Sequence, residues 1–277
     1  MKNNSQNSLS IFLISICFLT SCSLKINDRH NVQAFDDFPI TTNLFHEKII
    51  TDSILYSVGG LLLLDSVLIS VDFKADTFFQ VFKLPSFEYI GGFITKGSGP
   101  EEEIYIDPFI GRVSNNEFLF KGASSISFAK YNNNSNNLEI TTRINLPDNL
   151  MEIWNPIKLG DSIISNKTFS LVEKEYIGYN IKNKEQFDFG SDYPSVGKKI
   201  DPLLKGMVFA KANVVKPDGS AFACVYDKFP IWNWDGEPIK RILLDENIFA
   251  FDVDSHDNYI IASSLLSIDT FYKYNLK

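Results

Sequence analysis

Cysteine is scarce in this sequence of 277 residues, which contains only Cys17, Cys22 and Cys224. Cys17 lies in the apolar N-terminal run, and the leader described below assigns Cys22 to lipid attachment. No disulfide framework is then possible in the mature chain. Cys224 stands alone in an alternating strand pattern, so we expect a small, buried apolar side chain there rather than a catalytic thiol.

Clustered positive charge is also missing. The net charge is −8, the sequence pI is about 5.0, and no run of Lys and Arg occurs anywhere in the chain. A protein that binds nucleic acid needs a clustered basic footprint. We therefore predict that the partners do not include nucleic acid.

Signatures of catalysis are absent as well. The three histidines, His30, His46 and His256, lack the close His/Cys/carboxylate spacing of a zinc site. The G-x-S-x-G motif of serine hydrolases is missing, and no glycine-rich phosphate loop leads into a helix. We therefore predict no catalytic residue, no metal site and no cofactor.

Apolar runs of transmembrane length do not occur, and the apolar run at residues 11–19 is too short to span a bilayer. It follows the positive start at Lys2 and ends in Leu19-Thr20-Ser21-Cys22. This ending resembles a bacterial lipobox, in which the cysteine is acylated and becomes the new N-terminus. Residues 1–22 are thus predicted to be a lipoprotein signal peptide, with Cys22 as the lipid-attachment residue. An ordinary signal peptide with a coincidental cysteine is the alternative.

The polar residues 23–37 are predicted to form a flexible tether between this anchor and a single domain at residues 38–277. Several acyl chains give the stable membrane attachment that one chain does not. Ser23, in the position after the cysteine, fits transport to an outer membrane. The predicted location is the cell envelope, lipid-anchored at the outer membrane, on its periplasmic face or at the cell surface.

Aromatic residues are plentiful, at 14% of the sequence with 24 phenylalanines, which favours sheet over helix. Two kinds of turn alternate along the chain. Tight polar turns between two apolar runs occur at Asp65-Ser66, Asn115-Asn116, Asp161-Ser162, Asp218-Gly219 and His256-Asp257-Asn258. Hairpin turns after an aromatic-rich strand occur at Pro85-Ser86, residues 132–137, residues 182–184, Asp235-Gly236 and near Asn275.

Each repeat therefore reads as four strands, over roughly 40 to 57 residues, which is the size of a propeller blade. The strands are apolar on both faces, so the blades must pack face to face around an axis. Five units can be counted. The last unit lacks a strand, and the strand-like residues 45–56 are predicted to complete it and close the ring. Residues 190–206 do not fit the period, and we predict one helical turn at residues 201–206. The segment is either an insertion or the remains of another blade.

A family resemblance rests on the lipobox, on Gly91-Gly92, and on residues 96–102, KGSGPEE. These resemble the TolB-like six-bladed β-propeller lipoproteins of Bacteroidetes and their "K-G-x-G-P-x-E-[FY]" signature. Residues 231–245, IWNWDGEPIKRILLD, resemble a late-blade pattern of the same family. The resemblance implies an all-β propeller of four-stranded antiparallel blades, six of them by the family pattern, and no catalytic residues. This chain departs from the signature at Glu103, where the family has an aromatic residue.

The stretch at residues 91–104 is predicted to connect one blade to the next. Its glycines are expected to supply positive φ and close backbone approach, and its carboxylates Glu101, Glu102 and Glu103 are expected to lie in a solvated loop. The residues DVDSHDN at 252–258 partly resemble a calcium loop, but Asp257 occupies the glycine position and Ser263 that of the closing glutamate. A turn between two strands is the preferred interpretation.

Trp232 and Trp234 share one strand face and are the candidate binding residues, for a sugar ring or a protein, although packing between blades explains them equally. The predicted function is a binding or scaffold module for an envelope protein or a glycan. The alternative is a carbohydrate-active enzyme, a glycoside hydrolase or lyase, with an acidic site in the central channel. The candidate residues for this acidic site are the aspartates that lie near the predicted inner strands, namely Asp65, Asp107, Asp161 and Asp252.

Overall fold

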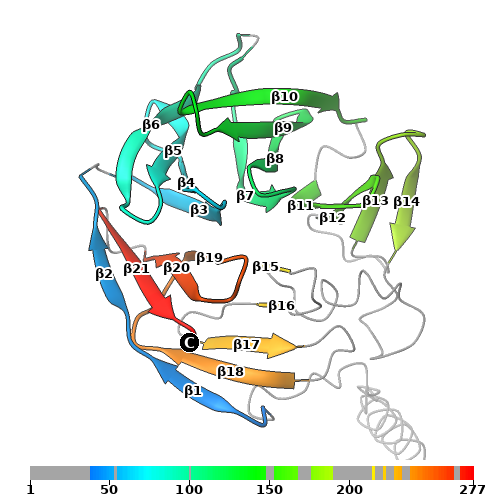
Figure 1. Ribbon diagram of the computed structural model, residues 1–277. Helices are drawn as coiled ribbons and strands as arrows, with labels where there is room; N and C mark the ends of the chain where they lie inside the picture. Colours follow the sequence, from blue (N-terminus) through cyan, green and yellow to red (C-terminus); the bar gives the residue numbers. More distant parts are fainter. Residues whose placement is uncertain are drawn as a thin grey trace, which may run out of the picture. The chain divides into compact units, whose positions relative to one another are not determined.

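A computed structural model describes residues 38–52, 55–99, 101–147, 153–167, 176–189, 214–215, 221–222, 228–232, 238–264 and 269–277. Cα packing divides the chain into the units Met1–Ala34 and Phe35–Lys277, and all described residues belong to the second. In these residues the structure is built of strands arranged as five sheets, which follow one another around a common centre (Figure 1). The predicted all-β propeller of four-stranded antiparallel blades is confirmed.

Three blades consist of four consecutive strands each, with the first strand innermost. The first contains β3 (Val58–Leu63), β4 (Val67–Asp72), β5 (Thr77–Lys83) and β6 (Glu88–Thr95). The second contains β7 (Ile106–Arg112), β8 (Glu117–Gly122), β9 (Ser125–Asn132) and β10 (Asn137–Asn145). The third contains β11 (Ile153–Leu159), β12 (Ser162–Lys167), β13 (Tyr176–Asn180) and β14 (Gln186–Phe189).

The two remaining sheets incorporate the N-terminal strands β1 (Thr41–Leu44) and β2 (Glu47–Ile50). The fourth sheet contains β15 (Val214–Val215), β16 (Ala221–Phe222), β17 (Lys228–Trp232) and β18 (Pro238–Leu244), with β1 added beside β18. The fifth contains β19 (Ala250–Val253), β20 (Tyr259–Ser263) and β21 (Thr270–Asn275), with β2 as its outer strand.

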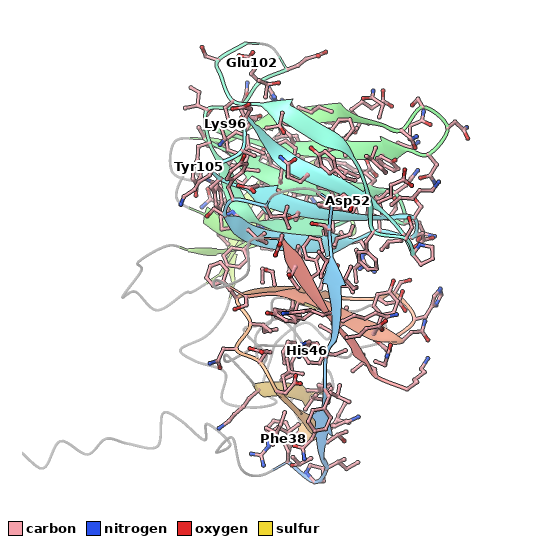
Figure 2. All side chains as sticks on the ribbon, turned by 90° about the vertical axis from the view of Figure 1, so that its left-hand side faces the viewer. Phe38, His46, Asp52, Lys96, Glu102 and Tyr105 are labelled. Atoms are coloured by element: carbon pink, nitrogen blue, oxygen red, sulfur yellow. The ribbon has the colours of Figure 1, made fainter. Side chains whose placement is uncertain are left out.

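Ring closure by the N-terminal segment is confirmed, because β2 pairs antiparallel with β21 from Glu47↔Lys273 to Ile50↔Thr270. The segment also does more than the sequence predicted. Just before β2, the strand β1 pairs in parallel with β18 and makes that blade five-stranded. Residues 38–52, here called the clamp, thus bind two neighbouring blades and run along one side of the propeller (Figure 2).

The core lies between the blades, because the strands are apolar on both faces. In β4, for example, Ile69 and Val71 pack toward the second blade, while Leu68 packs toward the fifth. Aromatic rings meet edge to face across these seams. Phe79 contacts Phe118 of the second blade with centroids 5.3 Å apart. Such T-shaped pairs are the favoured geometry for aromatic side chains and help to fix one blade on the next.

The predicted turns lie between strands wherever the structure describes them. Asp65-Ser66, Asn115-Asn116 and His256-Asp257-Asn258 connect the first and second strands of their blades. The hairpin turn predicted near Asn275 is the exception, because the fourth strand beside β21 is β2 of the N-terminal segment. The predicted turns at Asp218-Gly219 and Asp235-Gly236, and residues 190–206, lie outside the described residues.

Candidate functional site

The candidate site lies on the face of the propeller where each outer strand is connected to the next inner strand. Because the strands within a blade alternate in direction, all these links lie on the same face, here called the link face. Four of the links are described in whole or in part: residues 245–249 before β19, 51–57 before β3, 96–105 before β7, and 146–147 of the link before β11. Loops held on a rigid scaffold in this way commonly carry the function of a fold.

A small hollow opens on the link face between the first residues of three inner strands. Its walls come from Gly59, Gly60 and Leu61 of β3, Pro108, Phe109 and Ile110 of β7, and Phe249, Ala250 and Phe251 at the start of β19. Its volume is about 30 Å³, enough for one or two waters. This is an order of magnitude below the volume of usual small-molecule sites, so it does not enclose a sugar ring.

Close packing of the inner strands explains the small volume. A Cβ added to Gly60 would overlap the carbonyl oxygen of Pro108, and one added to Gly111 would lie 2.6 Å from the carbonyl oxygen of Pro156. The same glycine-to-proline contact thus joins β3 to β7 and β7 to β11. Both prolines lie where the pairing of their strand with its neighbour shifts register. Proline has no backbone N–H to donate. It is tolerated at these positions because, on an edge strand at a bulge, no hydrogen bond between strands requires that N–H.

An ion pair lies farther along the same three inner strands. Asp252 of β19 accepts hydrogen bonds from the Arg112 guanidinium at 3.0 Å and from the backbone N–H of Leu63 at 2.6 Å. Arg112 also donates to the carbonyl of Val253 at 3.2 Å. Burial raises the pKa of Asp252, and the Arg112 charge partly offsets this effect. The ion pair therefore joins β19, β3 and β7 near the centre of the ring.

The acidic residues proposed for an enzyme do not converge. Asp65 and Asp161 are exposed in turns, and Asp161 pairs with Lys182. Asp107 lies at the start of β7, about 16 Å of backbone before Arg112 at the usual rise per residue, and Asp252 of β19 binds Arg112 at the end of that strand. A glycosidase needs two carboxyl groups about 5 to 10 Å apart. The four acids instead lie in two exposed turns and at opposite ends of β7, and no group of three potential metal ligands occurs among the described residues.

Asp107 is the most perturbed acid of the link face. Its side chain is buried, and its Oδ1 accepts a hydrogen bond from the backbone N–H of Phe109 at 3.0 Å. Burial raises the pKa of Asp107 to about 6, although the Phe109 hydrogen bond and the charge of the buried Lys121 act in the opposite direction. Asp107 adjoins the hollow through Pro108, so its charge changes beside the candidate site near pH 6.

The raised pKa predicts a specific pH dependence of stability. The pKa of Asp107 is higher in the folded than in the unfolded protein. The stability that depends on its protonated carboxyl group is therefore fully present below the unfolded pKa and is lost as pH rises through about 6. We expect Asp107→Asn to become more stable relative to wild type by about 2 kcal/mol between pH 4 and pH 7. Urea unfolding of both proteins at several pH values measures this difference. A difference that does not change with pH would contradict it.

The loop at residues 96–103 is structural, and part of its prediction was wrong. Glu103 is buried and pairs with Arg143 of β10 at 2.8 Å, so it does not lie in a solvated loop. Glu102, at the projecting part of the loop (Figure 2), accepts a hydrogen bond from the Gly99 N–H at 2.9 Å. A Cβ on Gly97 would overlap the Glu102 carboxylate. Gly97 and Gly99 therefore make room for this side chain and do not adopt positive φ.

The other residues singled out in the sequence contribute less. Cys22 and Trp234 lie outside the described residues, and of Trp232 only the backbone is described, in β17. The DVDSHDN stretch forms the predicted turn, in which Asp254 accepts hydrogen bonds from the backbone N–H groups of His256 and Asn258. His46 packs edge to face on Tyr272 and contacts Asp245 at 3.1 Å, so it holds the clamp in place.

Sequence reasoning missed the exposed apolar side chains of the link face. Tyr56, Ile104, Tyr105 and Phe249 are 54%, 71%, 40% and 51% exposed. They belong to three different links, and Phe249 also lines the hollow. Tyr105 lies toward one edge of the propeller in the side view (Figure 2). Only their position in the links could have signalled them, because each one alone is an ordinary apolar residue in the sequence.

The model of the TolB-like 6-blade propeller-like family matches residues 60–189, which confirms the predicted resemblance. None of the curated proteins matches the chain. Among solved structures, a protein of Bacteroides fragilis described as exported is 13% identical, with a TM-score of 0.46, over 85% of this chain and 80% of that chain. A DUF4221 family member from Bacteroides vulgatus is 7% identical, with a TM-score of 0.45, over 84% and 98%. PorZ, a surface component of the type-IX secretion system of Porphyromonas gingivalis, is 9% identical, with a TM-score of 0.36, over 80% and 25%.

Proposed function

This chain folds as a propeller similar to the TolB-like family, and we propose that it is a lipid-anchored binding module. Its link face would hold a protein partner. One observation carries the proposal. Tyr56, Ile104, Tyr105 and Phe249 keep large apolar surfaces in water on the links around a nearly filled hollow. Exposed apolar and aromatic residues gathered on one face are typical of protein interaction sites.

A protein fits this face better than a glycan or a small molecule. The hollow has too little volume to enclose a sugar ring, so recognition has to come from the surface around it. Isoleucine and phenylalanine offer apolar area without hydrogen-bonding groups, as the desolvated centre of a protein interface requires. The four acids named for the enzyme alternative lie in separate turns and strand ends, and we do not favour it.

Attachment to the membrane through Cys22 is part of the same proposal, and it is supported by the lipobox-like Leu19-Thr20-Ser21-Cys22. In the part of the chain that the structure describes, no helix has the length and hydropathy to cross a bilayer. We expect Cys22→Ala to give a periplasmic form that leaves the membrane fraction and no longer incorporates labelled fatty acid. Unchanged fractionation and labelling would contradict the attachment.

Photo-cross-linking in native envelopes tests the link face directly. A photoreactive amino acid placed at Phe249 or Ile104 is expected to cross-link one protein, while the same group at Phe187 is not. Phe187 is a suitable control because it is 39% exposed but lies on the outer strand β14. Equal cross-linking from all three positions would remove the link face as the binding surface. Binding to a glycan array without any protein adduct would favour a glycan instead.

A further inference from the structure

The clamp exposes large apolar side chains beside residues that pack inward. Leu44 and Ile49 pack against the cores between the blades. Next to them, Phe45 and Ile50 are 77% and 72% exposed, the highest values among the large apolar residues that the structure describes. Ile40, at the start of the clamp, is 53% exposed. No described strand lies beyond β1 in its sheet, and the clamp runs along the outer wall of the propeller (Figures 1 and 2).

We propose that this outer wall rests on the lipid bilayer, with Ile40, Phe45 and Ile50 dipping into its interface. The proposal rests on the lipid attachment at Cys22 proposed above. It goes beyond that attachment, because the folded propeller itself contacts the membrane and takes a defined orientation on it.

The position of the clamp in the chain favours a bilayer as the occupant of this surface. Fifteen residues, 23–37, separate Cys22 from Phe38. The flexible tether predicted there would span about 22 Å on average. The clamp is where this chain joins the fold, so it is the part of the propeller held nearest to the lipid. A tether of this kind raises the local concentration so far that weak apolar contacts suffice for binding.

The spacing of the apolar residues also fits a bilayer better than a protein. Ile40, Phe45 and Ile50 recur every five residues, before β1, between β1 and β2, and at the end of β2, so they are spread over up to about 33 Å of chain. Polar residues, including Thr41, Asn43 and Lys48, lie between them. A protein interface needs a contiguous desolvated centre. A lipid interface accepts separate apolar side chains while the polar residues between them stay among the headgroups.

The orientation has a functional consequence. The clamp belongs to the outer wall, whereas the apolar side chains proposed to hold a protein partner lie on the links around the axis. A propeller that rests on its clamp therefore leaves the link face free for a partner at the membrane surface.

The test uses the full-length, lipidated chain reconstituted in vesicles of phosphatidylethanolamine and phosphatidylglycerol. A fluorophore is attached to Phe45→Cys or Ile50→Cys in a Cys224→Ala background, and quenching by nitroxide-labelled lipid is measured. Both labels are expected to be quenched several times more strongly than a label at Ile104→Cys, which is 71% exposed on the link face and serves as the matched control. In the Phe45→Cys protein, adding Ile40→Ser and Ile50→Ser is expected to weaken the quenching. These residues are exposed, so we expect the melting temperature to stay unchanged.

Three outcomes would overturn the proposal, and they are distinguishable. If the chain floats with the vesicles but the labels at 45 and 50 are quenched no more than the label at 104, the outer wall does not touch lipid. The attachment through Cys22 is then still supported. If both labels are already shielded in detergent and the chain is dimeric, a second copy covers the wall. If the chain does not float with the vesicles, the attachment through Cys22 fails, and the wall contact fails with it.

Discussion

Deletion of residues 38–50 is expected to unfold the propeller. The deletion removes β1 and β2 and takes Leu44 and Ile49 out of the cores between the blades. It also uncovers β21, where Phe271 and Tyr272 are buried, and leaves the outer edge of β18 unpaired. We expect a loss of about 5 kcal/mol or more, comparable with the whole stability of many domains.

Circular dichroism and a thermal melt of the shortened chain measure this loss, and a peptide of residues 38–52 added in trans is expected to restore the cooperative transition. Phe45→Ser is the matched control, because this residue belongs to the clamp but is 77% exposed. Its melting temperature should remain close to that of wild type. A cooperative melt of the shortened chain at the wild-type temperature would show that the clamp does not close the ring.

The repeat could be predicted from the sequence because its signals are local. Polar turns such as Asp65-Ser66 stand between runs that are mostly apolar on both faces, and such runs indicate strands covered on both sides. The missing fourth strand of the last unit then pointed to the N-terminal residues. The strand β1 could not be predicted in the same way. Its sequence, TTNL, is short and polar, and its pairing with β18 depends on residues about 200 positions away.

The site was harder to predict than the fold, since the role of each residue depends on neighbours that are distant in the chain. Glu103 follows two other glutamates and reads as solvated, yet Arg143, which neutralises it, lies 40 residues later. Gly97 reads as a residue that needs positive φ, yet it does not adopt one and lies against the Glu102 carboxylate. Phe249 and Tyr56 share the link face only because antiparallel blades place all the links on one side.

Arg112→Met is expected to destabilise the protein by about 2–4 kcal/mol at pH 7, because it leaves the buried Asp252 without its ion pair. The backbone N–H groups of Leu63 and Val253 would still bind the carboxylate, but no charge would offset its burial. Burial already raises the pKa of Asp252 in the wild-type protein, and the loss of Arg112 would raise it further. A buried carboxyl group with a raised pKa destabilises the folded protein only when it is ionised. Its cost is therefore absent below the unfolded pKa and grows as the pH rises. The deficit of Arg112→Met relative to wild type should therefore shrink as the pH is lowered.

The cause of this effect can be separated from lost packing by a double-mutant cycle with Asp252→Asn, which keeps an acceptor for the Leu63 N–H while removing the charge. If the charge is the cause, Arg112→Met should cost much less in the Asp252→Asn protein than in wild type. Lys182→Met provides the control for an exposed pair, since Lys182 and Asp161 are 75% and 56% exposed, and we expect a loss of less than about 1 kcal/mol. The same cost in both backgrounds would mean that Arg112 acts through packing. The inner strands would then be held together by contacts such as the one between Gly60 and Pro108, and not by the ion pair near the centre of the ring.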